Sequence, residues 1–202
     1  MATITADQVK KLRDATGAGM MECKAALAEA NGNFDEATTL LRKRGLAQAA
    51  KRAGRATGNG LISSYIHMGG RIGVLIEVNC ETDFVARTPE FQTLAKEIAM
   101  HIAAASPLVV RREELDLTLL EKEREIYRAQ FATSGKPANV IDKIVEGKLD
   151  SYYSQVCLMD QPSVRDPNTT IKQMVATATA KTGENVTVTR FVRFKLGELA
   201  QE

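Results

Sequence analysis

The chain has 202 residues, with 27 basic and 25 acidic side chains, 44% hydrophobic residues and no Trp. This near balance of charge argues against a nucleic acid or an anionic membrane as the main partner, since both require a clear cationic surplus. Residues 1–9 contain no apolar run, so we expect no signal peptide. No stretch approaches the ~20 apolar residues of a membrane-spanning helix. Three separated cysteines without a CxxC pair (Cys23, Cys80 and Cys157) indicate buried, reduced thiols in a cytoplasmic protein.

Residues 1–50 are predicted to form three short helices, at about 6–14, 20–30 and 34–44. Thr5 is a suitable N-cap for the first of them. So small a core is marginal by itself and suits a docking module better than a catalytic one. The apolar positions at helical spacing are Val9, Leu12, Met20, Cys23, Ala26, Leu27, Ala30, Phe34, Ala37, Leu40 and Leu41.

Residues 46–60 change in character: their first part can be helical and their end is a turn. Residues 51–60 are interpreted as a linker between domains. Small residues accompany the basic side chains of Lys51, Arg52 and Arg55, and Gly58-Asn59-Gly60 then turns the chain. These cations leave open an RNA-binding alternative. A solvated connector explains so few charges more simply, so we expect no direct contact with nucleic acid.

Residues 61–202 are predicted to form an α+β core. Strands are expected at 61–67 and 71–79, turned at Met68-Gly69-Gly70, and a distant third strand at 186–196 completes a three-stranded antiparallel sheet. Helices that pack this sheet are expected at 90–105, 115–131, 138–158 and 171–182. The turn at 134–137 favours an antiparallel helical hairpin at about 115–158.

No sequence pattern indicates catalysis, a cofactor or a metal site. The chain lacks GxxxxGK[ST], lacks GxGxxG after a strand and lacks GxSxG. Its two histidines, His67 and His101, have no second ligand at metal-binding spacing. A carboxylate pair stays possible among 25 acidic residues, but we expect a protein that is not an enzyme.

Two adjacent methionines follow the glycines of Thr16-Gly17-Ala18-Gly19. One reading is that Met20 and Met21 both fill a small core. The other is that one of the two faces outward, where flexible and polarizable methionines often line binding surfaces.

A second unusual segment, Asn79-Cys80-Glu81-Thr82-Asp83-Phe84-Val85-Ala86-Arg87, follows a predicted strand. Phe84 is expected on a connection or a short helical turn. It either packs into an interface between its own sheet and helix, or it is a rigid apolar probe for a pocket in a partner, with Asp83 adding a polar contact.

The second helix of the predicted hairpin has a long apolar stripe. It either packs only against its companion helix or offers surface to another subunit. The stripe consists of Ile141, Ile144, Val145, Leu149, Tyr152 and Val156.

Several segments, in this order, resemble the elongation factor Ts family across nearly the whole chain. They are LRDATGAGMMECKAAL (12–27), EVNCETDFV (77–85), AMHIAAASP (99–107), SGKP with VEGKL (134–149), the Gln161-Pro162 step and RFVRFKLGE (190–198).

This resemblance implies a guanine nucleotide exchange factor for elongation factor Tu. It implies a ubiquitin-associated-like three-helix domain at 1–50 that docks on the G domain of Tu, and a core whose last strand faces the third domain of Tu. The segment around Phe84 is implied to displace Mg²⁺ near the phosphates and so loosen GDP. The positions that match family contacts are Leu12, Met20, Met21, Thr82, Asp83, Phe84, Val85 and His101.

The chain also departs from the longer members of that family. It resembles a short form with one core subdomain and a protruding hairpin, so we expect a homodimer and a 2:2 complex with Tu. The last 45 residues contain no Cys that could tie this dimer together, and Ser163 replaces an expected Phe. The alternative function is a non-enzymatic interaction module with a dimerising core and another partner.

Overall fold

The computed structural model describes residues 4–198, which fall into two compact units. Each unit combines segments that are far apart in the sequence. Within the described residues, the first is built from residues 4–61, 78–94 and 173–187, and the second is built from residues 62–77, 95–172 and 188–198.

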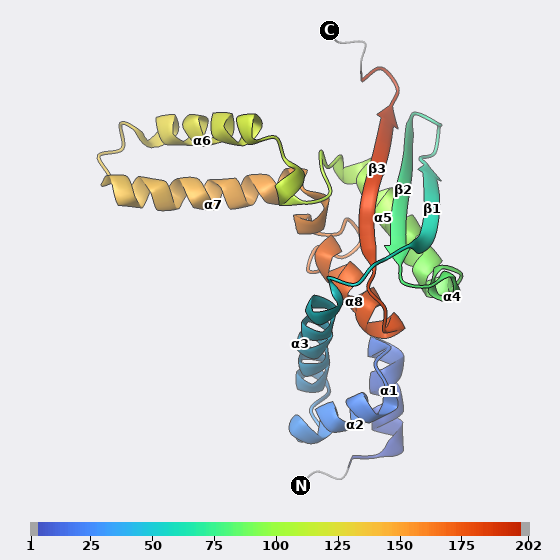
Figure 1. Cartoon of the computed structure of the whole chain (residues 1–202). Coiled ribbons are helices and arrows are strands. Elements are labelled where there is room, and N and C mark those ends of the chain that lie inside the picture. Colours follow the sequence, from blue (N-terminus) through green and yellow to red (C-terminus); the bar gives the residue numbers. More distant parts are fainter. Residues whose placement is uncertain (1–3, 199–202) are drawn as a thin grey trace. The chain divides into compact units, whose positions relative to one another are not determined.

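The first unit begins with three helices, here called the three-helix unit: α1 (Ala6–Thr16), α2 (Met20–Glu29) and α3 (Phe34–Arg52) (Figure 1). Thr5 caps α1 in a capping box with Gln8, as its position predicted. Gly17 ends α1 at φ 69°, a conformation that glycine adopts without steric cost. The buried core consists of Val9, Leu12, Cys23, Ala26, Leu27, Ala30, Ala37 and Leu41.

Helix α3 ends at Arg52 and so extends beyond the end predicted at residue 44. The residues after Gly45, Leu46-Ala47-Gln48-Ala49-Ala50-Lys51-Arg52, are strong helix formers, so Gly45 does not stop the helix. Gly45 instead allows close packing, because a Cβ atom there would lie 3.2 Å from Cβ of Ala180 in α8 (Ile171–Thr182). The first part of the predicted linker is therefore helical.

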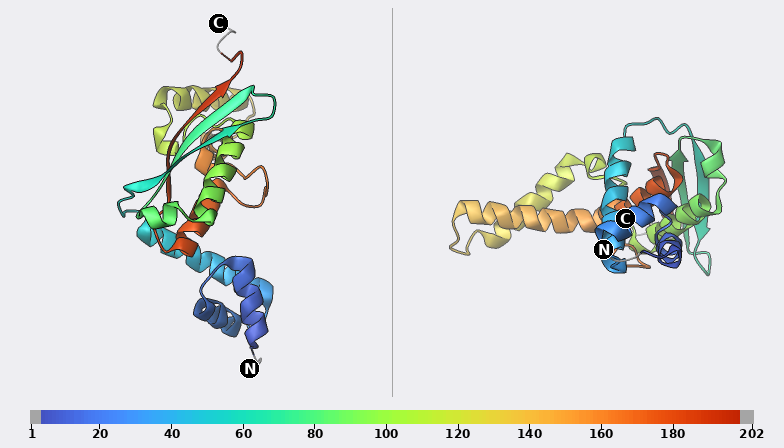
Figure 2. Two further views of the ribbon diagram at one scale, coloured as in Figure 1. Left: turned by 90° about the vertical axis from the view of Figure 1, so that its right-hand side faces the viewer. Right: turned by 90° about the horizontal axis from the view of Figure 1, so that it is seen from below.

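The sheet has three antiparallel strands in the order β1 (Asn59–Ile66), β2 (Ile72–Cys80) and β3 (Thr187–Lys195), as predicted (Figures 1 and 2). The alternation of apolar residues predicted one inward face of the central strand β2. Of that face, Val74, Ile76 and Val78 are buried and Ile72 at the strand start is half-buried, while Cys80 continues the buried face. In β3, Val188 is buried, whereas Val192 and Phe194 are exposed.

Helix α5 (Pro89–Ala105) follows the short helix α4 (Asp83–Ala86). Its apolar residues at helical spacing form one buried stripe, which makes α5 a principal core helix. The stripe consists of Phe91, Leu94, Ala95, Ile98 and Ile102.

The predicted helical hairpin is present as α6 (Leu117–Phe131) and α7 (Ala138–Val156), which run side by side in opposite directions (Figures 1 and 2). Asp116 caps α6 by accepting from the Thr118 N–H at 2.8 Å, so the helix begins after residue 115. Short 3₁₀ turns precede and follow the hairpin at Arg112–Glu114 and Leu158–Asp160.

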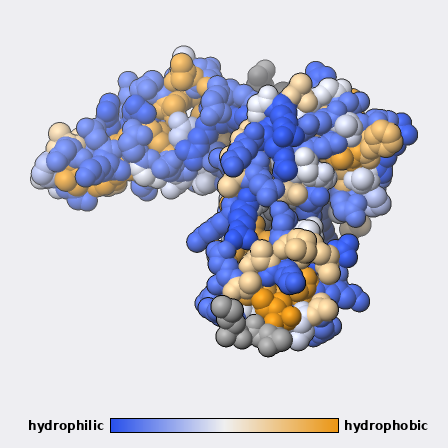
Figure 3. Space-filling view, turned by 60° about the horizontal axis from the view of Figure 1, so that its bottom comes forward, coloured by the Kyte–Doolittle hydropathy of each residue, from blue (hydrophilic) through white to orange (hydrophobic). Residues whose placement is uncertain are grey.

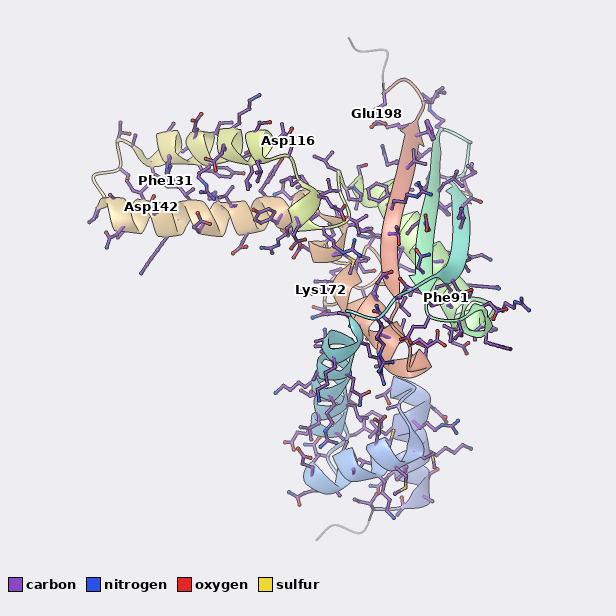
Figure 4. The ribbon with its side chains drawn as sticks, viewed as in Figure 1. Phe91, Asp116, Phe131, Asp142, Lys172 and Glu198 are labelled. Atoms are coloured by element: carbon purple, nitrogen blue, oxygen red, sulfur yellow. The ribbon has the colours of Figure 1, made fainter. Side chains whose placement is uncertain are left out.

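Two ion pairs join the hairpin helices, between Arg124 and Glu146 at 3.4 Å and between Arg128 and Asp142 at 3.3 Å. Figure 4 labels Asp142 on α7 and Phe131 at the end of α6. Only Val145 and Leu149 of the α7 stripe are fully buried.

Cys23, Cys80 and Cys157 are all buried and unpaired, as predicted. Burial is the main cause that raises the pKa of the Cys157 thiol, to about 11, and it is also the main cause that raises the pKa of the Cys80 thiol. No helix within residues 4–198 has the length and apolar character to cross a membrane.

Candidate partner-binding site

The connection between β2 and α5 carries the most exposed Phe side chain among residues 4–198. Phe84 is 79% exposed and lies on α4, the short helical turn that was predicted. The reading in which Phe84 packs into its own sheet–helix interface is wrong. The reason is helical geometry, because the buried residue of α4 is Ala86, which lies roughly 200° around the helix from Phe84.

Residues 82–86 are called the Phe84 segment below. Hydrogen bonds to the loop between α8 and β3 hold this segment in place. The Thr82 N–H donates to Glu184 Oε2 at 3.0 Å, and the Thr82 hydroxyl donates to Glu184 Oε1 at 2.6 Å. The Asn185 N–H donates to Glu81 Oε1 at 2.6 Å. That bond, and then the Arg55 guanidinium, lowers the pKa of the Glu81 carboxyl below its ordinary value. The segment therefore has a fixed base beneath an exposed ring.

Glu184 and Asn185 were missed in the sequence analysis. Thr82 and Glu184 are separated by 102 positions, and no local pattern links such distant residues. The one available signal was Gly183 before Glu184-Asn185, a combination typical of a tight turn.

Asp83 and Val85 flank the exposed ring in different environments. The Asp83 carboxylate pairs with Arg87 at 2.8 Å, and both side chains are at least half exposed. A surface pair one helical turn apart adds little stability, so a partner can compete for Asp83 at small cost. Val85 is half-buried, and its carbonyl accepts from the Thr88 hydroxyl at 2.8 Å.

Met20 and Met21 are both exposed at the start of α2, by 45% and 75%. The reading in which both fill the core is therefore wrong, and Met20 does not join the buried face of α2 as its spacing predicted. That face is built by Cys23 and the residues one turn further on, Ala26 and Leu27. Figure 3 shows apolar residues gathered on the surface of the three-helix unit.

Leu12 and His101 are buried, at 0% and 1% exposure. Leu12 belongs to the core of the three-helix unit. His101 lies in α5 of the second unit, where its Nε2 donates to Gln161 Oε1 at 2.8 Å and its Nδ1 accepts from the Val164 N–H at 3.3 Å. Burial lowers the pKa of His101, and the Gln161 bond opposes this in part, so the ring is neutral.

Ser163, the residue that replaces an expected Phe, lies beside the residues that contact His101. It is buried, its N–H donates to the Thr169 carbonyl at 2.8 Å, and its hydroxyl accepts from the Arg165 N–H at 3.3 Å. A compact polar turn thus fills this position.

The structure brings most of the predicted site residues into the first unit: Leu12, Met20, Met21, Thr82, Asp83, Phe84 and Val85. His101 belongs to the second unit. Among residues 4–198, no group of three or more His, Cys, Asp or Glu side chains could hold a metal ion. Exposed apolar side chains on capped helix starts can bind a protein surface, which is the chemistry that this arrangement offers.

Comparison with known proteins gives a consistent family assignment. Residues 2–198 match the family described as Elongation factor TS. Elongation factor Ts of Fervidobacterium nodosum is 60% identical over 96% of the chain and 99% of that relative. Those of Carboxydothermus hydrogenoformans and Geobacter sulfurreducens are 56% and 57% identical, over 96% and 97% of the chain and 90% and 91% of their own lengths. The chain therefore belongs to the elongation factor Ts family and acts in the elongation stage of translation.

Proposed function

We propose that this chain binds elongation factor Tu and promotes the release of GDP from it, without catalysing a reaction of its own. The observation that carries the proposal is Phe84, an aromatic side chain that is 79% exposed on a hydrogen-bonded base. An exposed Phe forgoes roughly 1.5–3 kcal/mol of burial free energy. A pocket in a partner recovers that free energy.

The physical basis of exchange is linkage between two ligands of Tu. If this chain binds empty Tu more tightly than Tu·GDP, it must weaken GDP binding by the same factor. In this scheme Phe84 and Asp83 are pushed into the G domain beside the Mg²⁺ and phosphate site, and their insertion displaces the ion and loosens GDP.

Met20 and Met21 supply a second contact with the G domain. Both side chains are exposed, and methionine adapts its shape to an apolar surface. Leu12 supports this contact indirectly, because it is buried in the three-helix core that carries α2. His101 likewise acts through packing in the core, which faces the third domain of Tu.

The sheet supports a homodimer, and hence a 2:2 complex with Tu. The face of β2 opposite to its buried residues carries Leu75, and Ile62, Val192 and Phe194 of the other strands are also exposed. Ile66, Gly73 and Phe194 line one shallow groove. An apolar sheet face of this kind packs well against a second copy of itself.

The basic connector gives RNA binding little support. Arg52 donates to the Thr179 carbonyl at 3.5 Å, and Arg55 pairs with Glu81 at 3.4 Å. Two of the three cations in the connector thus have intramolecular partners.

A factor that meets Tu in this way works in the cytoplasm.

Release of a fluorescent GDP analogue from Tu tests the exchange function. The wild-type chain should accelerate release, and Phe84→Ala should lose most of that acceleration while staying folded. Ile126→Ala is a matched control, since Ile126 is an exposed apolar residue of α6, at 50%. No acceleration by the wild type, together with no capture of Tu in a pull-down, would favour an interaction module with another partner.

Light scattering at micromolar concentration tests the dimer. The wild type should have twice the mass of one chain, and Phe194→Asp should have the mass of one chain because a buried carboxylate opposes sheet packing. A monomeric wild type with full exchange activity would refute the dimer.

A further inference from the structure

We propose that Glu184 and Asn185 are positioning residues that set the direction of Phe84 and join the Phe84 segment to the connector, the residues that follow α3 from Ala53 onward. This inference rests on the proposed exchange function. It adds to that function two residues that lie outside the segment itself.

Glu184 holds the start of the Phe84 segment by both carboxylate oxygens. One oxygen accepts from the Thr82 N–H and the other from the Thr82 hydroxyl, at 3.0 and 2.6 Å. The same hydroxyl accepts from the Val85 N–H at 3.5 Å and so caps α4. Glu184 therefore fixes the residue from which the helix under Phe84 begins.

Asn185 joins the same place to the connector. Its N–H donates to Glu81 Oε1 at 2.6 Å, and its side-chain amide donates to the Arg55 carbonyl at 2.9 Å and the Ala53 carbonyl at 3.5 Å. The residue is buried, at 4% exposure. One short loop thereby holds the connector, Glu81 and Thr82 together.

The Phe84 segment needs this external support. A helix of four residues is far too short to be stable by itself. Only Ala86 of α4 is buried, and the ring of Phe84 is too exposed to anchor the helix. Without Glu184, the segment would have to be ordered in the step in which Phe84 enters Tu and loosens GDP, and the entropy lost in that ordering slows the step.

Exchange kinetics with three variants tests the proposal. Glu184→Ala should lower the maximal rate of GDP release by on the order of tenfold, about 1.4 kcal/mol, the scale of ordering one residue. Glu184→Gln should retain most of the rate, because its side-chain oxygen can accept from the Thr82 N–H while its NH₂ donates to the Thr82 hydroxyl. In the Phe84→Ala background, Glu184→Ala should cause no further loss, since both changes act through one ring.

A wild-type rate for Glu184→Ala, or a further loss in the Phe84→Ala background, would overturn the positioning role. Urea unfolding of each variant identifies a loss that comes from global destabilisation.

The two hydrogen bonds from Thr82 to Glu184 are called the Glu184 clamp here. Amide hydrogen exchange in the free chain tests this clamp without Tu. Glu184→Ala should speed exchange at residues 82–86 and leave α1 unchanged, and Glu184→Gln should not. Unchanged protection at 82–86 would refute the clamp even if the chain proves to be an exchange factor. Faster exchange there, with no effect of the wild type on GDP release, would leave the clamp intact and refute only the proposed function.

Discussion

Phe84 and Phe91 lie seven residues apart and have opposite environments. Phe84 is 79% exposed on the four-residue α4, whereas Phe91 is 1% exposed near the start of α5, where Figure 4 labels it. The Phe91 N–H donates to the Thr88 hydroxyl at 3.3 Å, a helix-cap bond that helps to fix its backbone. The comparison shows that the same side chain can stabilise the fold at one position and be left free for a partner at another.

The largest expected effect comes from Phe91→Ala. Removing a buried ring leaves a cavity as well as a lost transfer free energy, so this change should lower the free energy of unfolding by about 3–5 kcal/mol. Urea denaturation followed by circular dichroism measures it. A loss of under about 1 kcal/mol would show that Phe91 does not anchor the core.

Leu12 and Met21 extend the comparison to the three-helix unit. Leu12→Ala should destabilise the chain by about 2–5 kcal/mol, because Leu12 is fully buried. Met21→Ala should leave stability within about 0.5 kcal/mol and weaken binding to Tu, because that side chain is 75% exposed. Thermal unfolding and titration of Tu separate these outcomes. If Leu12→Ala and Met21→Ala both stay folded and lose the same affinity for Tu, then Leu12 does not act only in the core and Met21 does not act only in the contact.

His101 should make stability depend on pH. Burial lowers its pKa in the folded chain, so as the pH falls through the ordinary histidine value of about 6.5 the unfolded chain binds more protons than the folded chain. Stability therefore falls as the pH drops through that range, by at most about 1.4 kcal/mol per pH unit. His101→Gln keeps an amide donor for Gln161 and should remove this component. An identical pH dependence in the variant would contradict it.

The smallest expected effect on stability belongs to Phe84→Ala. The exposed ring contributes little to the fold, so the free energy of unfolding should change by less than about 0.5 kcal/mol. Parallel denaturation of Phe84→Ala and Phe91→Ala tests this directly. A loss above about 2 kcal/mol for Phe84→Ala would mean that the ring packs in solution.

Periodic elements could be predicted from the residues themselves. The α5 stripe and the alternation in β2 are dictated by which positions must face a core, and both are buried as expected. The end of α3 was misplaced because Gly45 was interpreted as a helix end, whereas strong helix formers follow it and the missing side chain allows α8 to pack closely at Ala180. The outward direction of Phe84 depended on the position of Ala86, and apolar character alone could not decide it.

The Glu184 clamp and the neutral state of His101 were beyond prediction for a common reason. Each depends on a polar partner from a distant segment: Thr82 lies 102 positions before Glu184, and Gln161 lies 60 positions after His101. Short-range periodicity carries no record of such pairs.

The separation of Thr82 and Glu184 also has a consequence for the order of folding. Closing so long a loop loses chain entropy before any contact repays it, so contacts of this kind form late. The three-helix unit and the β1–β2 turn are built from contacts between neighbouring elements and can form early. We therefore expect the chain to acquire its protein-binding aromatic probe last, after α8 and the turn beyond it have joined the rest of the first unit.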